Sequence, residues 1–106
     1  MRIRAFNVRA ARIDGRSVDL RACTLAVRIG SDGRRGWEAS AWVHRADPEL
    51  TGRADIGRAL PVSLETELGP TLNGEAFLSV GRAPGSHAGG APLFLVGVGP
   101  LRPWPA

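Results

Sequence analysis

The strongest constraint on the fold of this chain is a two-residue hydrophobic alternation that recurs in short runs. It is clearest in one stretch, where one face takes Cys23, Leu25, Val27 and Ile29. Alternation of this kind is typical of a β-strand with one buried face. The same period runs through residues 37–44, with Trp37 and small residues on one side, and through residues 62–68. No helical heptads occur, so these patterns predict an all-β chain.

Glycine and proline separate the alternating runs. They make up 14 and 8 of the 106 residues, about a fifth of the chain against a usual share nearer an eighth. After a first strand over residues 3–13, Asp14 and Gly15 predict a tight type I′ hairpin turn. The apolar parity changes inside this strand, which predicts a bulge or bend near Phe6. Further loops are expected at residues 30–36, 69–74 and 81–92.

Three other segments depart from simple alternation. Asp47, Pro48 and an acidic first turn predict one helical turn that ends at Gly52. The run at 93–98 is almost wholly apolar, which predicts a strand covered on both faces, either at the centre of a barrel or against another subunit. The proline-rich residues 100–106 predict an extended arm, because proline cannot join the interior of a sheet.

These elements amount to six or seven short strands with one short helical turn. A small antiparallel β-barrel fits this pattern best, and a two-sheet β-sandwich is the alternative. The length of 106 residues suits one domain. We therefore predict a barrel domain over residues 1–100 and a C-terminal arm over 101–106.

Composition excludes several classes of enzyme. All 14 basic residues are arginine, and neither lysine nor tyrosine occurs. Without lysine there is no Walker phosphate loop, no Schiff-base nucleophile and no anchor for pyridoxal phosphate. With one cysteine and two histidines, neither a disulfide framework nor a Cys/His zinc site is expected.

The remaining reactive side chains have simpler interpretations. Cys23 is in phase with core positions and is expected to be a buried thiol. His44 and His87 are expected at the surface, and Glu65 and Glu67 on a solvated acidic face. We therefore predict no enzymatic activity, no catalytic or metal-binding residues and no cofactor.

The chain starts without an apolar segment of the secretory type. Its longest uncharged run, residues 83–101, is interrupted by glycine and proline and cannot form a membrane helix. A location in the cytoplasm or in a viral or phage-like particle is expected, with no membrane partner.

Charge is distributed unevenly along the chain. Residues 1–45 carry ten arginines and four acidic residues, a balance of +6, whereas the remainder carries a balance of −2, which together give the net +4. A basic half favours contact with nucleic acid, an anionic surface or an acidic partner. For nucleic acid the candidate residues are Arg2, Arg4, Arg9 and Arg12. Phe6 is the only aromatic residue among the first 30, which weakens this alternative, and a GC-rich genome would also explain arginine in place of lysine.

Tryptophan and arginine are enriched at the centres of protein interfaces. Trp42 falls on the outward parity of its strand, and Trp104 lies in the arm. We therefore predict a protein interface that includes Trp42, His44, Arg34, Arg35, Trp104 and Arg102. The alternatives are that Trp104 folds back on its own barrel and that Trp42 belongs to the second face of a sandwich.

Four segments, residues 37–43, 47–50, 57–64 and 74–78, follow the order of an aromatic strand, an acidic connector, a glycine-led strand and a glycine-initiated return strand. This order resembles the small β-barrel domains of tail hub and baseplate proteins in long-tailed phages. The resemblance implies a structural subunit of a phage or phage-like particle that acts through contacts with other proteins or copies of itself. Nucleic-acid binding is the alternative function, and a small-ligand pocket in the barrel mouth is a third.

Overall fold

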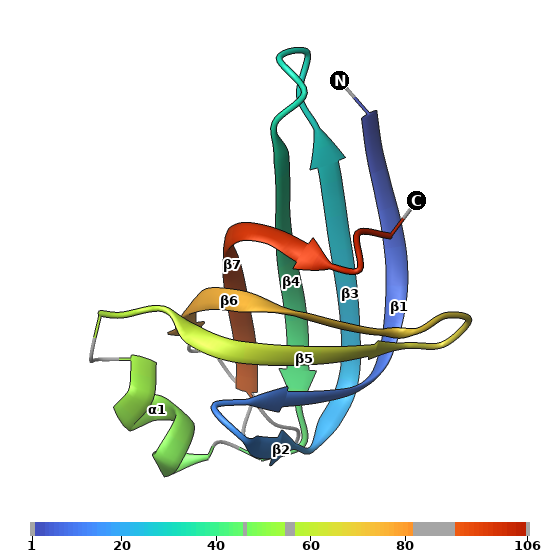
Figure 1. Cartoon of the computed structure of the whole chain (residues 1–106). Helices are drawn as coiled ribbons and strands as arrows, with labels where there is room; N and C mark the ends of the chain where they lie inside the picture. Colours follow the sequence, from blue (N-terminus) through green and yellow to red (C-terminus); the bar gives the residue numbers. More distant parts are fainter. Residues whose placement is uncertain (1, 46, 55–56, 82–90, 106) are drawn as a thin grey trace.

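The computed structural model describes residues 2–45, 47–54, 57–81 and 91–105 (Figure 1). Six antiparallel strands close into a barrel in the order β1, β3, β4, β7, β6, β5, with β5 returning to β1, and β2 adds a seventh strand beside β1. This confirms the predicted barrel over the sandwich. The elements are β1 (Arg2–Ile13), β2 (Arg16–Val18), β3 (Leu20–Ile29), β4 (Arg35–Val43), α1 (Pro48–Ala54), β5 (Leu60–Thr66), β6 (Thr71–Val80) and β7 (Ala91–Arg102).

The first strand is shared between two parts of the sheet. Residues 2–7 pair with β3, and residues 8–13 pair with β5. The register shifts between Val8 and Ala10, so the irregularity predicted near Phe6 lies a few residues later, where the strand enters the closed barrel. Asp14 and Gly15 have φ angles of 53° and 77°, which confirms the predicted type I′ turn.

The barrel interior is filled by the alternating side chains that the sequence places inward. They are Val8, Ala11, Ile13, Cys23, Leu25, Val27, Trp37, Ala39, Ala41, Val43, Leu60, Val62, Leu64, Leu72, Ala76, Leu78, Leu93, Leu95 and Leu101. Trp37 is the largest of the fully buried side chains, with 1% of its surface exposed. The small residues that follow it on β4 leave room for the leucines of the opposite wall.

Two glycines make space for the indole of Trp37. A Cβ atom on Gly97 would lie 2.2 Å from Trp37 Nε1, and one on Gly74 would lie 3.4 Å from its Cζ2. Trp37 Nε1 donates a hydrogen bond to the carbonyl of Gly99 at 3.1 Å. The indole is therefore packed directly on the backbones of β6 and β7, and its one polar atom has a partner.

Three predicted boundaries were wrong. The helix runs through Gly52 to Ala54, because Leu50 packs into the core and Asp47 Oδ1 accepts a hydrogen bond from the Glu49 amide at 3.0 Å. Strand β6 begins at Thr71, so most of the loop expected at 69–74 is strand. Strand β7 continues to Arg102 because Leu101 is buried, with 1% exposed. Most of the loop expected at 81–92 lies outside the described residues.

The close contact between Gly97 and Trp37 yields a stability prediction. Gly97→Ala should lower the free energy of unfolding by about 2 to 3 kcal/mol, because the new methyl group overpacks the core against the indole. Chemical denaturation followed by circular dichroism measures this change.

Gly52→Ala is the matched control, since no atom lies within 4 Å of the position of its added Cβ. In the helix it should raise the free energy of unfolding by about 0.5 to 1 kcal/mol. Equal stability of the two variants would contradict the packing described for Trp37.

Candidate interaction surfaces

The outer side of β7 is apolar and exposed. Leu93 and Leu95 point into the barrel, whereas Phe94, Val96 and Val98 point outward and are 42%, 51% and 42% exposed. The sequence predicted that this strand is covered on both faces. The described residues of this chain do not bury its outer side. The prediction that the barrel itself covers both faces of this strand was therefore wrong, and cover by another subunit stays a prediction.

Neighbouring strands add aromatic side chains to this surface, among polar residues that include Glu38 opposite Val96 and Ser40 opposite Phe94. On β6, Phe77 is 46% exposed and lies directly opposite Val96, and on β4 the half-buried Trp42 lies opposite Pro92. Side chains opposite each other in adjacent strands lie on the same side of the sheet. We call the following set the outer apolar face: Trp42, Phe77, Pro92, Phe94, Val96 and Val98.

A second surface lies at the end of the barrel where both termini are found. There β1, β3 and β4 extend beyond the level at which β5 and β6 cross them (Figure 1). Across these strands Arg2 is in register with Ile29 and Ile29 with Arg35, and the next row of the same parity joins Arg4, Val27 and Trp37. The three arginines therefore lie on the side of the projecting sheet that continues into the barrel interior.

The C-terminal arm crosses this end of the barrel. Trp104 is half-buried against the core, and the guanidinium carbon of Arg35 lies 5.5 Å from the centre of its ring. Arg4 lies 5.3 Å from the centre of the Phe6 ring. Both are cation–π distances. The predicted alternative that Trp104 folds back on its own barrel agrees with this packing.

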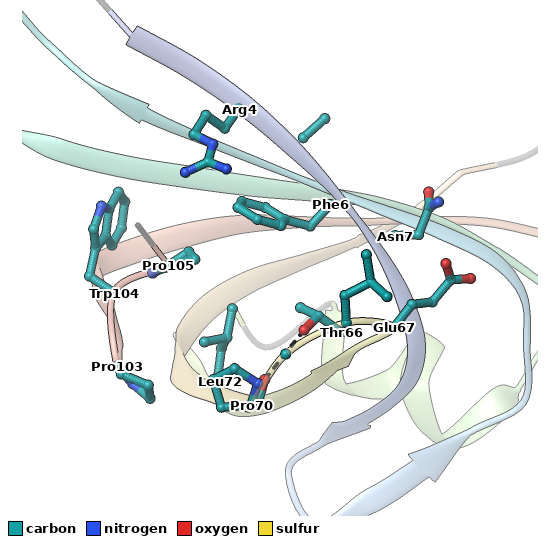
Figure 2. A pocket seen from close by; sticks show the side chains of 13 residues that line it. Arg4, Phe6, Asn7, Thr66, Glu67, Pro70, Leu72, Pro103, Trp104 and Pro105 are labelled. Atoms are coloured by element: carbon teal, nitrogen blue, oxygen red, sulfur yellow. Dashed lines mark hydrogen bonds between the residues drawn. The ribbon is translucent and has the colours of Figure 1, made fainter.

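Between the arm and β1 lies a cavity of about 550 Å³, which we call the mouth pocket (Figure 2). Its walls are residues 4–7 of β1, residues 66–70 and Leu72 of the β5–β6 hairpin, and residues 103–105 of the arm. Figure 2 shows the rings of Phe6 and Trp104 on opposite sides of this space, with Arg4 above them. Asn7 and Glu67 supply polar atoms at the other end.

The structure separates the six residues predicted to form one protein interface. Arg35 and Trp104 are in contact at the mouth pocket, with Arg34 in the adjoining hairpin, where it pairs with Asp32. Arg102 ends β7 immediately before the arm residues 103–105 that line the mouth pocket. Trp42 belongs instead to the outer apolar face, and His44 follows the other end of β4, where its amide donates to the Asp19 carbonyl at 3.1 Å. One predicted interface thus becomes two surfaces.

The four arginines predicted for nucleic-acid binding also separate. Arg2 and Arg4 share one side of β1 with Phe6. Arg9 forms an ion pair with Glu65 on the neighbouring strand. Arg12 lies on the part of β1 between β2 and β5, opposite serines in both. Only the first two lie beside the mouth pocket.

Other arginines of the basic half pair with acidic residues. Arg16 Nε lies 2.8 Å from Asp47 Oδ2 and fixes the start of the helix to β2. This hydrogen bond lowers the pKa of Asp47 and raises that of Arg16. Arg28 and Glu38 are 3.7 Å apart. Of the ten arginines in residues 1–45, Arg9, Arg16, Arg28 and Arg34 thus lie within ion-pair distance of a carboxylate.

The side chains with catalytic potential are dispersed. Cys23 is 6% exposed, and burial raises the pKa of its thiol to about 11. Among the described residues no group of three histidine, cysteine, aspartate or glutamate side chains is placed to hold a metal ion. Glu65 is engaged by Arg9, and His87 lies outside the described residues.

Within the described part of the chain, none of the helices has the length and apolar character needed to cross a membrane.

The mouth pocket was only partly foreseen from the sequence. The sequence offers a pocket in the barrel mouth only as a third possibility and indicates no residues for it. The available signal was the shared parity of Arg4 and Phe6, which places a cation and a ring on one side of β1. The contribution of Trp104 depends on the path of the arm and has no local signature.

Comparison with protein-family models, curated proteins and solved structures found no match for this chain.

The absence of lysine and tyrosine makes Cys23 the main side chain that titrates between about pH 8 and 11. Its pKa is higher in the folded chain than in the unfolded chain, so its contribution to stability is complete below about pH 8 and is lost as the pH rises toward 11. The free energy of unfolding should fall by about 2 to 3 kcal/mol across this window. Cys23→Ala, measured in parallel by denaturation, should remove most of this dependence, and an unchanged pH profile would contradict the burial of the thiol.

Proposed function

We propose that this protein is a non-enzymatic interaction subunit that assembles with other protein subunits through the outer apolar face. The observation that carries the proposal is the uncovered outer side of β7, where two valines and a phenylalanine are each more than 40% exposed. Contiguous exposed apolar patches on a small protein mark interaction sites. Aromatic residues are enriched at the centres of such sites, and this face contains three of them.

The first partner that we propose is a second copy of the chain. Arg28 on β3 is opposite Gly36 on β4, and Glu75 on β6 is opposite Val98 on β7. By continuation of the β4–β7 register these four positions form one row across the sheet. Arg28 and Glu75 thus stand on opposite sides of β4 and β7, and Arg28 also lies 3.7 Å from Glu38 of its own chain.

A two-fold axis parallel to the strands exchanges the two sides of this row. It would place Arg28 of each copy over Glu75 of the other, with the apolar side chains of β7 packed between them and Glu38 and Ser40 of β4 on the same side. Isologous interfaces require this kind of self-complementarity. A dimer of ordinary size buries about 800 Å² of each partner, so the apolar face would form its centre and the charged residues its rim.

The resemblance to tail hub and baseplate domains adds a finer proposal, that the assembly is a phage or phage-like particle. The support for it is the order of sequence segments. The barrel alone does not distinguish such a particle from other assemblies, since folds of this kind serve many functions.

Nucleic-acid binding has less support. Phosphate binding is favoured where several unpaired cations follow one surface, but Arg9 and Arg28 are paired with carboxylates and Arg12 is distant from the mouth pocket. One observation does favour nucleic acid, because the fold places the rings of Phe6 and Trp104 beside Arg4 and Arg35. The mouth pocket also contains the carboxylate of Glu67, which opposes an anionic backbone.

Phe94→Arg should disrupt the proposed dimer, because it places a charge at the centre of the apolar face. The dissociation constant should rise at least about tenfold, as measured by size-exclusion chromatography with light scattering over a range of concentrations. Leu68→Arg is the matched control, since Leu68 is fully exposed away from this face and its substitution should leave the dimer intact.

The proposed axis has its own test. Arg28→Glu should weaken the dimer through like-charge contact with Glu75, and the double variant Arg28→Glu with Glu75→Arg should restore it. A wild-type chain that stays monomeric up to about 1 mM would overturn the proposal of a second copy. If the double variant does not restore the dimer, the two-fold arrangement is wrong.

A further inference from the structure

One edge of the barrel sheet stays open beside the mouth pocket. Residues 2–7 of β1 pair with β3 on one side, whereas β5 pairs with β1 only from Val8 onward. The amide of Glu67 donates to the Asn7 carbonyl at 3.0 Å, and this is the last backbone contact on that side among the described residues. Backbone groups toward the N-terminus of β1 therefore lack a strand partner there.

The contact at Asn7 identifies which groups face the open edge. In an antiparallel strand the N–H and C=O of one residue point to the same neighbour, and those of the next residue point to the other. Since the Asn7 carbonyl points toward β5, Ile3 and Ala5 present their N–H and C=O groups to the open side. Open edges of this kind pair readily with another chain.

The mouth pocket lies against this edge. Residues 4–7 of β1 form one of its walls, and the rings of Phe6 and Trp104 with Leu72 give it an apolar lining. A strand added beside β1 would direct alternate side chains toward this lining. The pocket volume of about 550 Å³ is sufficient for a large apolar side chain and its neighbours.

The charges beside the edge favour an acidic partner. Arg2 and Arg4 point to the same side as Phe6, and the ion pairs among the described residues do not include either arginine. On an added antiparallel strand, the residues opposite Phe6, Arg4 and Arg2 would share one face. An apolar residue followed by acidic residues at every second position would match this row.

We propose that the protein binds an extended acidic segment of a partner protein, which pairs as an added strand with residues 2–6 of β1 and inserts an apolar side chain into the mouth pocket. This mode of recognition takes affinity from backbone hydrogen bonds and selectivity from pockets for alternate side chains. It uses a surface separate from the outer apolar face and does not depend on the proposed dimer.

The probe is a fluorescein-labelled, C-amidated hexapeptide with the sequence Thr-Phe-Val-Glu-Val-Glu. In antiparallel register its phenylalanine lies opposite Phe6 and its glutamates opposite Arg4 and Arg2, while its valines face Ala5 and Ile3. Fluorescence anisotropy should show saturable binding below about 1 mM. The same peptide with lysine in place of glutamate should bind at least about tenfold more weakly.

Ala5→Pro and Ala5→Val form a matched pair of variants. The first removes the N–H that faces the open edge, at a position where an edge strand tolerates proline, and the second keeps it. Ala5→Pro should weaken peptide binding about fivefold or more, and Ala5→Val should leave it nearly unchanged. Circular dichroism establishes that both variants are folded.

A change in the peptide tests the same hydrogen bonds with the wild-type protein. Methylation of both valine amides, which face β1, should abolish binding, whereas methylation of the glutamate amides should have a small effect. Trp104→Ala should weaken binding by removing one wall of the pocket, and Phe94→Arg should not alter it. This last comparison separates failure of the peptide site from failure of the proposed dimer.

Three results would overturn the proposal. They are no binding of the hexapeptide up to about 1 mM, equal effects of the two patterns of amide methylation, and tighter binding of single-stranded oligothymidylate than of the peptide at the same salt concentration. The last result would assign the arginines and rings of the mouth to nucleic acid.

Discussion

The barrel is organised around the packing of one indole on the backbones of two strands. Trp37 of β4 lies over the adjacent strand β7 and the next strand β6, where glycines admit its ring and the Gly99 carbonyl accepts its N–H. This contact joins the inner sides of β4, β7 and β6 through one side chain. It also explains why β4 continues with alanines, because a second large side chain on that strand would compete for the same volume. The leucines of the opposite wall fill the remaining space.

The sequence was informative wherever strand periodicity decided the structure. The inward parity of β3 and β4, the turn at Asp14 and the outward position of Phe77 follow from local patterns. Boundaries set by long-range packing were less accessible. Gly74 and Gly97 indicate turns or breaks in isolation, yet both lie inside strands because Trp37 occupies the space that a side chain would take. The sequence around a glycine does not indicate which distant side chain packs against its backbone.

The candidate sites were predictable to a smaller degree for a related reason. Residue type, the outward parity of Trp42 and the position of Trp104 in the arm predict an interface, but they do not reveal that the two residues belong to different surfaces. The outer apolar face depends on the register of β4, β6 and β7, which brings Phe77, Val96 and Trp42 together from distant parts of the chain. Likewise, the mouth pocket forms where the arm returns to β1. Both surfaces depend on the order in which the strands pair, and the periodicity of a single strand does not predict that order.

The pairing of β1 with β5, which closes the barrel and is called the seam here, affects how the chain folds. Several neighbouring strands lie close along the chain, but two pairs do not. The seam joins Val8 to Thr66, and the β4–β7 pair joins Glu38 to Val96. Contacts between such distant residues carry the largest loss of chain entropy and slow the folding of β-proteins. Until the seam closes, β5 and residues 8–13 of β1 each keep one edge without a strand partner. The newly made chain is thus most prone to aggregation just before it becomes a barrel.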